Sequence, residues 1–374
     1  MADDNPEDNP PVEEEQQEEP TAEEEAEGPK RIVICGATGR LGGSVLRRLQ
    51  SDGGWEIRAV TRTPDSDAAT ALADSGIEVV SGNYDDEESL ITAFDQYFAD
   101  GNDATAAGEK EQAQMYTIAS AASKIDSLEH FILLSMPAGE KLAEDLHVPQ
   151  FDFKDRAADQ IIADCPDLIP KTNFLWSGVF TSNFWEGKGF DKPFEVPDTN
   201  GIHTMIHPSK PNTLVPFTNV STNIGVFVST LLAKPEIALP ATYINCVKEV
   251  LTYEDALKIW SEVTGRTAVY VTVTDEDFQT LYGPGSLEFV QQMNFLAAAV
   301  GDWTSAYGAL DPSSVIGAAE LGIPDEELVD FRGSLEANKD SLLSWSPHRE
   351  YRRWGQKSLR VLRSRQEVTV QLGV

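Results

Sequence analysis

Short apolar runs alternate with stretches of helical periodicity over the first half of the chain. Residues 32–35 are β-branched or apolar and uncharged, which is typical of a strand buried on both faces. From residue 39 onward the apolar positions recur three and four apart, as on an amphipathic helix. The pattern then predicts strands at 55–60, 77–80, 131–134 and 174–180, and helices at 68–73, 87–98, 109–125 and 154–163. This order is typical of an open parallel sheet with helices on both faces.

One strand of the predicted strand–helix alternation has no matching apolar segment in the sequence. A doubly wound sheet needs a fourth apolar strand after the helix at 87–98, but residues 99–108 read ADGNDATAAG and contain no β-branched run. We therefore expect this strand to be absent, or reduced to about three residues near 96–99. The neighbouring strands would then be separated by a gap or would pair directly.

The second half of the chain differs in composition and in the length of its predicted elements. Residues 181–250 hold many Pro, Asn, Thr and aromatic residues in short segments; a capped helix is expected at 252–263, a strand at 268–273, and helical stretches up to 345. The predicted fold class is α/β: a doubly wound Rossmann-type parallel sheet with a degenerate fourth strand, plus a smaller mixed α/β C-terminal lobe. The expected division is an acidic disordered tail at 1–30, a dinucleotide-binding domain at 31–180, a smaller lobe interleaved with the sheet at 181–345, and a basic tail at 346–374.

Charge is distributed unevenly along the chain. The net charge is −33, and residues 1–29 carry 13 acids with no Lys or Arg, so we expect that tail to be disordered. The rest still carries −20, which disfavours direct binding of nucleic acid or of an anionic membrane. Residues 345–374 hold seven basic residues against two Glu. That segment is either a docking patch for an acidic partner or, as we favour, a tail that rests on the protein's own acidic surface.

The remaining composition limits the class of protein further. The chain has no apolar run long enough to span a bilayer, and we expect a soluble protein. Its three cysteines, Cys35, Cys165 and Cys246, are far apart and lack metal-ligand spacing. We expect buried thiols, no metal site and a reducing compartment, the cytoplasm with the nucleus as a second location.

Three glycines lie in the turn between the first strand and the first helix. Gly36, Gly39 and Gly42 have the spacing GxxGxxG. A dinucleotide site needs glycine there because the turn is tight, the backbone approaches a pyrophosphate, and the N–H groups of the helix start face the phosphate charge. We interpret the segment as a nucleotide-binding loop; the alternative is a purely structural turn.

Two positions after the next strands are candidates for the adenosine end of the ligand. Arg62 follows the second strand, where an acid would bind a ribose 2′-hydroxyl and an arginine would receive a 2′-phosphate. Arg62 therefore favours NADP(H), unless it is a surface arginine. Asn83 or Asp85 follows the third strand and is suited to contact adenine, whereas Asp85 and Asp86 are also suited to cap the next helix, which we favour for both acids.

In this order the segments resemble the NmrA-like family of atypical short-chain dehydrogenase relatives. The resemblance runs from about residue 31 to about residue 345 and rests on GATGRLGGSV, VTRTPDS, GIEVVSGNYDDEESL, HFILLS, QFDFKDRAADQI, FLWSGVFTSNFWE and LTYEDALKIWSEVTGR. It implies binding of NADP(H), with NAD(H) as the alternative. By the resemblance, the pyrophosphate lies against Gly36, Thr38, Gly39, Arg40, Leu41 and Gly42, the 2′-phosphate against Arg62, the adenine against Asn83 and the nicotinamide ribose against Lys154.

The resemblance implies two activities. Some members are redox-sensing regulators that bind partner proteins, including in transcriptional regulation, and isoflavone-reductase-type relatives reduce small aromatic substrates. Here Gln150 stands four residues before Lys154, where short-chain dehydrogenases carry the tyrosine that donates the proton. Trp176-Ser177-Gly178 also replaces the common Arg-Pro-Gly.

We therefore expect a regulator with little or no hydride transfer. The alternatives are an NADPH-dependent reductase of a small carbonyl or aromatic compound that uses Lys154 as its catalytic residue, and a scaffold that has lost the cofactor. The aromatic residues Phe180, Phe184 and Trp185 are either core or the wall of a substrate pocket, and we favour core.

Overall fold

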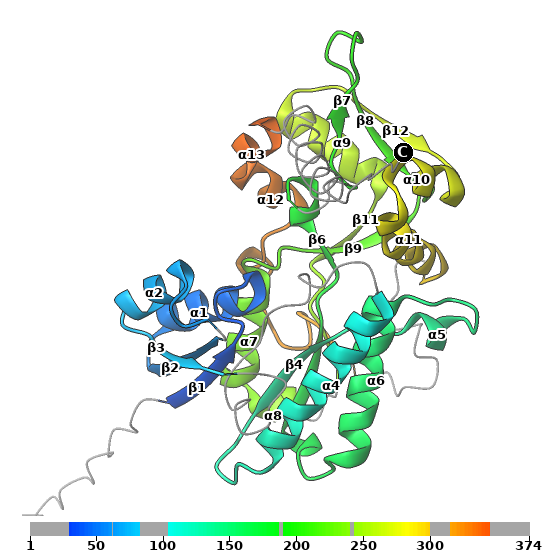
Figure 1. Cartoon of the computed structure of the whole chain (residues 1–374). Coiled ribbons are helices and arrows are strands. Elements are labelled where there is room, and N and C mark those ends of the chain that lie inside the picture. Colours follow the sequence, from blue (N-terminus) through cyan, green and yellow to red (C-terminus); the bar gives the residue numbers. More distant parts are fainter. Residues whose placement is uncertain are drawn as a thin grey trace, which may run out of the picture.

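The computed structural model describes residues 30–61, 63–82, 104–186, 190–239, 243–299 and 315–344, with the backbone alone for 104–107 and 344. Parallel strands flanked by helices form one part of the molecule, and shorter strands with helices α9–α13 form the other (Figure 1). The α/β fold class expected from the sequence is confirmed. The acidic tail at 1–29 and the segment after 344 lie outside the described residues.

The parallel strands form two sets. The first is β1 (Lys30–Cys35), β2 (Trp55–Thr61) and β3 (Glu78–Ser81), in that order. The second has the order β13-β10-β5-β4, with β4 at Phe131–Ser135, β5 at Thr172–Trp176, β10 at Tyr243–Asn245 and β13 at Val315–Ile316. Two short strands from the C-terminal half thus complete a sheet begun by the N-terminal half.

The junction between the two sets lies where the sequence predicts a degenerate fourth strand. Among the described strands, β1 pairs only with β2 and β4 only with β5, so β1 and β4 do not pair directly with each other. Val33, in the middle of β1, is 56% exposed. The direct pairing allowed by the sequence is therefore excluded for these strands. The expected helix at 87–98 and the degenerate fourth strand lie outside the described residues.

Helices cover both faces of the sheet. Leu175 belongs to one core cluster together with residues of α1 (Arg40–Asp52) and α7 (Asn223–Ala233). Its neighbours Phe174 and Trp176 belong to another cluster, with residues of α4 (Ala104–Ser123) and α6 (Pro149–Asp164). Alternate residues of one strand thus enter different cores, which explains why the last three residues of β5, Phe174–Trp176, are all large and apolar. Figure 1 shows the two helix pairs on opposite sides of β4.

Several expected boundaries need correction. The strand expected at 174–180 is two strands, because Gly178 adopts φ 73° and turns the chain, so that β6 (Val179–Phe180) pairs with β9 (Leu214–Thr218) instead. Helix α6 begins at Pro149 and not at 154, since proline is suited to the first turn of a helix. Helix α4 begins at residue 104, before the expected 109.

The smaller part of the molecule contains two three-stranded sheets. One has the order β12-β8-β7 (Ala268–Thr272, His203–His207 and Phe194–Glu195), and the other joins β11 (Glu249–Thr252) to β9 and β6. The helices of this part are α9 (Tyr253–Thr264), α10 (Asp275–Tyr282), α11 (Leu287–Ala299), α12 (Phe331–Ala337) and α13 (Lys339–Ser344). Short helices α2 (Asp67–Asp74), α5 (Gly139–Leu142) and α8 (Pro235–Ala238) complete the described α-helices of the chain.

Two further expectations can be checked in this part. The capped helix near 252–263 is confirmed, because the Thr252 side chain accepts the N–H of Asp255 at the start of α9. Phe184 is buried and packs edge-on against Phe217 and Phe331, so it is core and not pocket wall. Among the described helices, none has the length and apolar character needed to cross a bilayer.

Candidate dinucleotide-binding site

The glycine loop joins β1 to α1 through a close backbone contact. Gly36 adopts φ 63°, and its carbonyl accepts the N–H of Gly39 at 2.8 Å, which closes the turn. A Cβ atom added to Gly42 would lie 2.3 Å from the same carbonyl oxygen. Both positions therefore require glycine, one for its backbone angle and the other for the approach of helix to loop.

The start of α1 is suited to an anion. Gly39 is its N-cap; no side chain caps the helix, and no acid lies in its first turn. The first N–H groups of a helix have no partner within it, and the helix dipole places partial positive charge there. These groups belong to Arg40, Leu41 and Gly42, while Thr38 is exposed beside them. The expected pyrophosphate residues are thus brought together, and the cradle fits a phosphate group.

Arg40 extends from this loop to the smaller part of the molecule. Its Nη1 donates to Oγ of Ser182 at 2.8 Å and lies 3.1 Å from Oε2 of Glu186. Both partners lie in or just after the short 3-10 helix at Thr181–Phe184. The sequence showed Arg40 as a loop residue but not that it joins the two parts.

Lys154 lies at the carboxyl end of β4, on the other side of the sheet junction. Its backbone carbonyl accepts from Oγ of Ser135, the last residue of that strand, at 3.3 Å. Its Nζ donates to Oε2 of Glu111 at 2.7 Å and to the carbonyl of Gln150 at 3.0 Å. Ligands of open α/β sheets bind at the carboxyl ends of the strands, which is also where the glycine loop follows β1.

Neither Gln150 nor Tyr243 is suited to give up a proton near neutral pH. The Gln150 amide donates weakly to Gln292 at 3.5 Å, and its buried Oε1 has no hydrogen-bond partner among the described residues. Tyr243 stacks on Trp176 at 4.8 Å, and burial raises the pKa of its hydroxyl. In the segment Trp176-Ser177-Gly178, which replaces the common Arg-Pro-Gly, Ser177 is buried and its Oγ lies 3.8 Å from Sδ of Met136.

The cysteines do not supply a reactive thiol. Burial raises the pKa of Cys35, at the end of β1, to about 12, and burial also raises the pKa of Cys246. The nucleophilic and redox-active form of cysteine is the thiolate, which these environments disfavour. All three cysteines are free, and Cys165 and Cys246 are buried as expected.

The adenosine end of the expected site is only partly described. Arg62 and Asn83 lie outside the described residues. The strands that precede them are adjacent, since Thr61 of β2 pairs with Ser81 of β3. The two predicted contacts therefore follow neighbouring strand ends.

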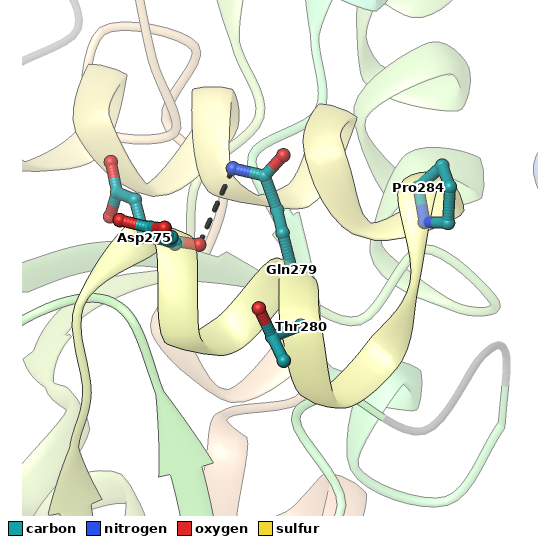
Figure 2. Close-up of a pocket in the computed structure, with 5 residues that line it drawn as sticks. Asp275, Gln279, Thr280 and Pro284 are labelled. Carbon is teal, nitrogen blue, oxygen red and sulfur yellow. Dashed lines mark hydrogen bonds between the residues drawn. The ribbon is translucent and has the colours of Figure 1, made fainter.

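Two other groups of polar residues lie away from the glycine loop. A depression of about 520 Å³ is lined by Asp275, Glu276, Gln279, Thr280 and Pro284, and Figure 2 shows these side chains along α10 and in the segment just after it. Glu140, His147 and Asp152 hold possible metal-ligand atoms within 4.8 Å of one another. However, Asp152 already accepts the N–H groups of Gly139 and Val148, and Glu140 pairs with Arg156. We read the three as a structural cluster.

Comparison with known proteins identifies the family. The model of the NmrA-like family matches residues 28–328. The chain belongs to the NmrA-like family. The resemblance seen in the sequence is confirmed, with an end nearer residue 328 than 345.

Three relatives place this NmrA-like chain in context. An NmrA-like family domain-containing oxidoreductase, hkm9, of Aspergillus hancockii is 26% identical over 329 residues, which cover 81% of this chain and 95% of hkm9. The structure of the negative transcriptional regulator NmrA in complex with NADP aligns with TM-score 0.59 and 16% identity over 83% of this chain and 94% of NmrA. Triphenylmethane reductase of Citrobacter sp., complexed with NADP(H), aligns with TM-score 0.53 and 19% identity over 76% of this chain and 98% of the reductase. At these identities the structures establish a shared fold.

Proposed function

We propose that this NmrA-like protein binds NADP(H) at the glycine loop and acts as a redox-sensing regulator with little or no hydride transfer. The observation that carries the proposal is the contact of Gly42 with the Gly36 carbonyl beneath an uncapped helix start. A merely structural turn does not need a backbone cradle that also leaves the first N–H groups of the helix without a capping side chain.

The residues near the lysine favour regulation over catalysis. Short-chain dehydrogenases use a tyrosine whose proton is released with the help of a lysine cation. Here Gln150 cannot exchange a proton near neutral pH, and the amine of Lys154 is engaged by a carboxylate at 2.7 Å. When bound, the nicotinamide would supply a hydride; the residues of this chain would then orient it without completing proton transfer.

The relatives support both this proposal and its alternative. NmrA is titled a negative transcriptional regulator in complex with NADP, which agrees with a cofactor-dependent regulator. The relative hkm9 is named an oxidoreductase, and the Citrobacter protein is a reductase. The second candidate is therefore an NADPH-dependent reductase of a small carbonyl or aromatic compound with Lys154 as acid or base. It needs only that the lysine be released from Glu111.

The proposal also covers the preferred cofactor, the kind of partner and the parts of the chain that bind them. Arg62 makes NADP(H) the preferred cofactor and NAD(H) the weaker one. A net charge of −33 disfavours direct contact with nucleic acid, so a transcriptional role would act through a partner protein, in the cytoplasm or the nucleus. Residues 31–180 would bind the cofactor, and the smaller lobe at 181–345 would offer the partner surface.

A turnover screen separates the two candidates. Quinones, aldehydes and aromatic ketones are offered with NADPH to the unmodified protein, to Lys154→Ala and to Lys258→Ala, which removes an exposed lysine on α9 as a control. We expect turnover well below about 1 s⁻¹, the low end of ordinary enzyme values. Turnover above that value, lost in Lys154→Ala but kept in Lys258→Ala while NADPH binding survives, would show the protein to be a reductase.

A further inference from the structure

Helices α4 and α6 pack closely enough to bring one carboxylate onto Lys154. A Cβ atom added to Gly108 of α4 would lie 2.0 Å from the ring of Phe153 on α6, so the ring packs directly against the backbone of α4 at this point. Glu111 is one helical turn after Gly108, and Lys154 is the residue after Phe153. Near this contact, the packing of the two helices brings Glu111 to face the lysine.

The resulting ion pair is largely removed from water. The side chains of Lys154 and Glu111 are 12% and 20% exposed, and Nζ lies 2.7 Å from Oε2. By contrast, the Arg31–Glu56 pair has side chains 85% and 56% exposed. Attraction between opposite charges increases as water is excluded, and removing one partner leaves the other charge poorly solvated. Lys154 also donates to the Gln150 carbonyl at 3.0 Å, so its ammonium is oriented by two acceptors from two helices.

We propose that Glu111 is the positioning residue of Lys154, orienting its amine for contact with the nicotinamide ribose. An ammonium held by a carboxylate and by a backbone carbonyl from two helices has a fixed direction, which suits it to bind a ribose hydroxyl. Glu111 thereby assigns the lysine to binding instead of to acid–base chemistry. The proposal rests on the proposed function for its reference to the ribose, but the ion pair itself can be tested without cofactor.

The test measures how fast Lys154 reacts with an amine-selective reagent. Reductive methylation is followed by peptide mass spectrometry between pH 7 and 10 in the unmodified protein, Glu111→Gln, Glu111→Asp and Glu109→Gln. Only a neutral amine reacts. Glu109→Gln is the matched control, because it removes the same charge from an exposed position of the same helix. Thermal unfolding of each variant is measured in parallel.

We expect Lys154 to react at least about tenfold faster in Glu111→Gln, the effect of losing one charge-assisted hydrogen bond. The control should react at the original rate, and Glu111→Asp, which keeps the charge on a shorter side chain, should be intermediate. Equal rates in the unmodified protein and Glu111→Gln would overturn the proposal. Glu111→Gln could also react faster only because it unfolds, in which case all the lysines of α4 and α6 would react faster. If in that case the folded Glu111→Asp variant protects Lys154 as well as the unmodified protein does, the proposal is overturned too.

An NADPH titration of the same samples keeps the two proposals apart. If the unmodified protein does not bind NADPH while Lys154 is protected by Glu111, the cofactor proposal fails and the positioning of the lysine stands. If NADPH binds and Lys154 is not protected, the reverse holds.

Discussion

Nη1 of Arg40 lies 3.1 Å from Oε2 of Glu186, so the cation nearest the start of α1 is already paired with an acid from the other part of the molecule. The two side chains are 45% and 44% exposed, and a pair of this kind contributes at most about 1 kcal/mol. A bound pyrophosphate would compete with Glu186 for the guanidinium. The ion pair therefore opposes cofactor binding slightly.

Replacing Glu186 by Gln should strengthen NADPH binding by about two- to fivefold, since the competing charge is removed and the cradle is unchanged. Isothermal titration measures the change. Glu56→Gln is the control, because it removes the same charge from an exposed pair with Arg31 near the amino ends of β1 and β2. Weaker binding in Glu186→Gln, or the same gain in both variants, would show that Glu186 does not compete.

Gly42→Ala tests the cradle. Its methyl group would lie 2.3 Å from the Gly36 carbonyl oxygen, so the loop or the helix must move. We expect the free energy of unfolding to fall by about 1–3 kcal/mol and NADPH binding to weaken by at least about tenfold. Chemical denaturation and fluorescence titration measure the two effects. Gly285→Ala is the control, because nothing lies within 4 Å of the added methyl group. Normal binding in Gly42→Ala would mean that the loop is not the phosphate site.

A buried polar network should stabilise the smaller part of the molecule. His207 lies between Asp191 and Ser209, with Nε2 3.1 Å from Oδ1 and Nδ1 2.8 Å from Oγ, and is surrounded by aromatic rings. Asp191→Ala leaves a buried ring nitrogen without its partner, which should lower the free energy of unfolding by about 1–3 kcal/mol. Urea denaturation measures this loss. Glu195→Ala, at an exposed position of β7, should change stability little, and an equal loss in both variants would argue against the network.

His130 gives the stability of the protein a pH dependence. Burial lowers the pKa of this imidazole, and the hydrogen bond between its Nε2 and Oδ1 of Asn173 at 2.7 Å opposes the shift only in part. Because the unfolded chain then binds the proton more readily, the free energy of unfolding should decrease as pH falls below about 6.5. The decrease should end once the folded-state pKa is passed. Denaturation at a series of pH values should show a smaller slope in His130→Gln, and an unchanged slope would contradict the assignment. The exposed His147→Gln is the control.

Local sequence signals predicted the glycine loop and the order of the first strands, because a turn and the elements on either side of it are specified by adjacent residues. The sequence could not show that the chain turns at Gly178, where φ is 73°, or that a Cβ atom there would lie 2.9 Å from the Pro216 carbonyl oxygen of a distant strand. Nor could it show β10, whose three residues are too few to form a pattern. The sequence also did not identify Glu111 as the partner of Lys154. The two residues are 43 positions apart, and only the packing of two helices brings them together.

Cofactor binding itself is tested most directly by titrating the protein with NADPH and with NADH while following nicotinamide fluorescence. Arg62→Ala is compared with the unmodified protein and with Arg58→Ala, a control on β2 whose guanidinium pairs with Glu78. We predict that NADPH binds about tenfold or more tightly than NADH, because a charge-assisted hydrogen bond to the 2′-phosphate contributes that much affinity. That preference should be lost in Arg62→Ala and kept in Arg58→Ala. Equal affinity for the two nucleotides would remove the role assigned to Arg62. If neither nucleotide binds, the protein is not an NADP(H)-binding protein but a scaffold without cofactor.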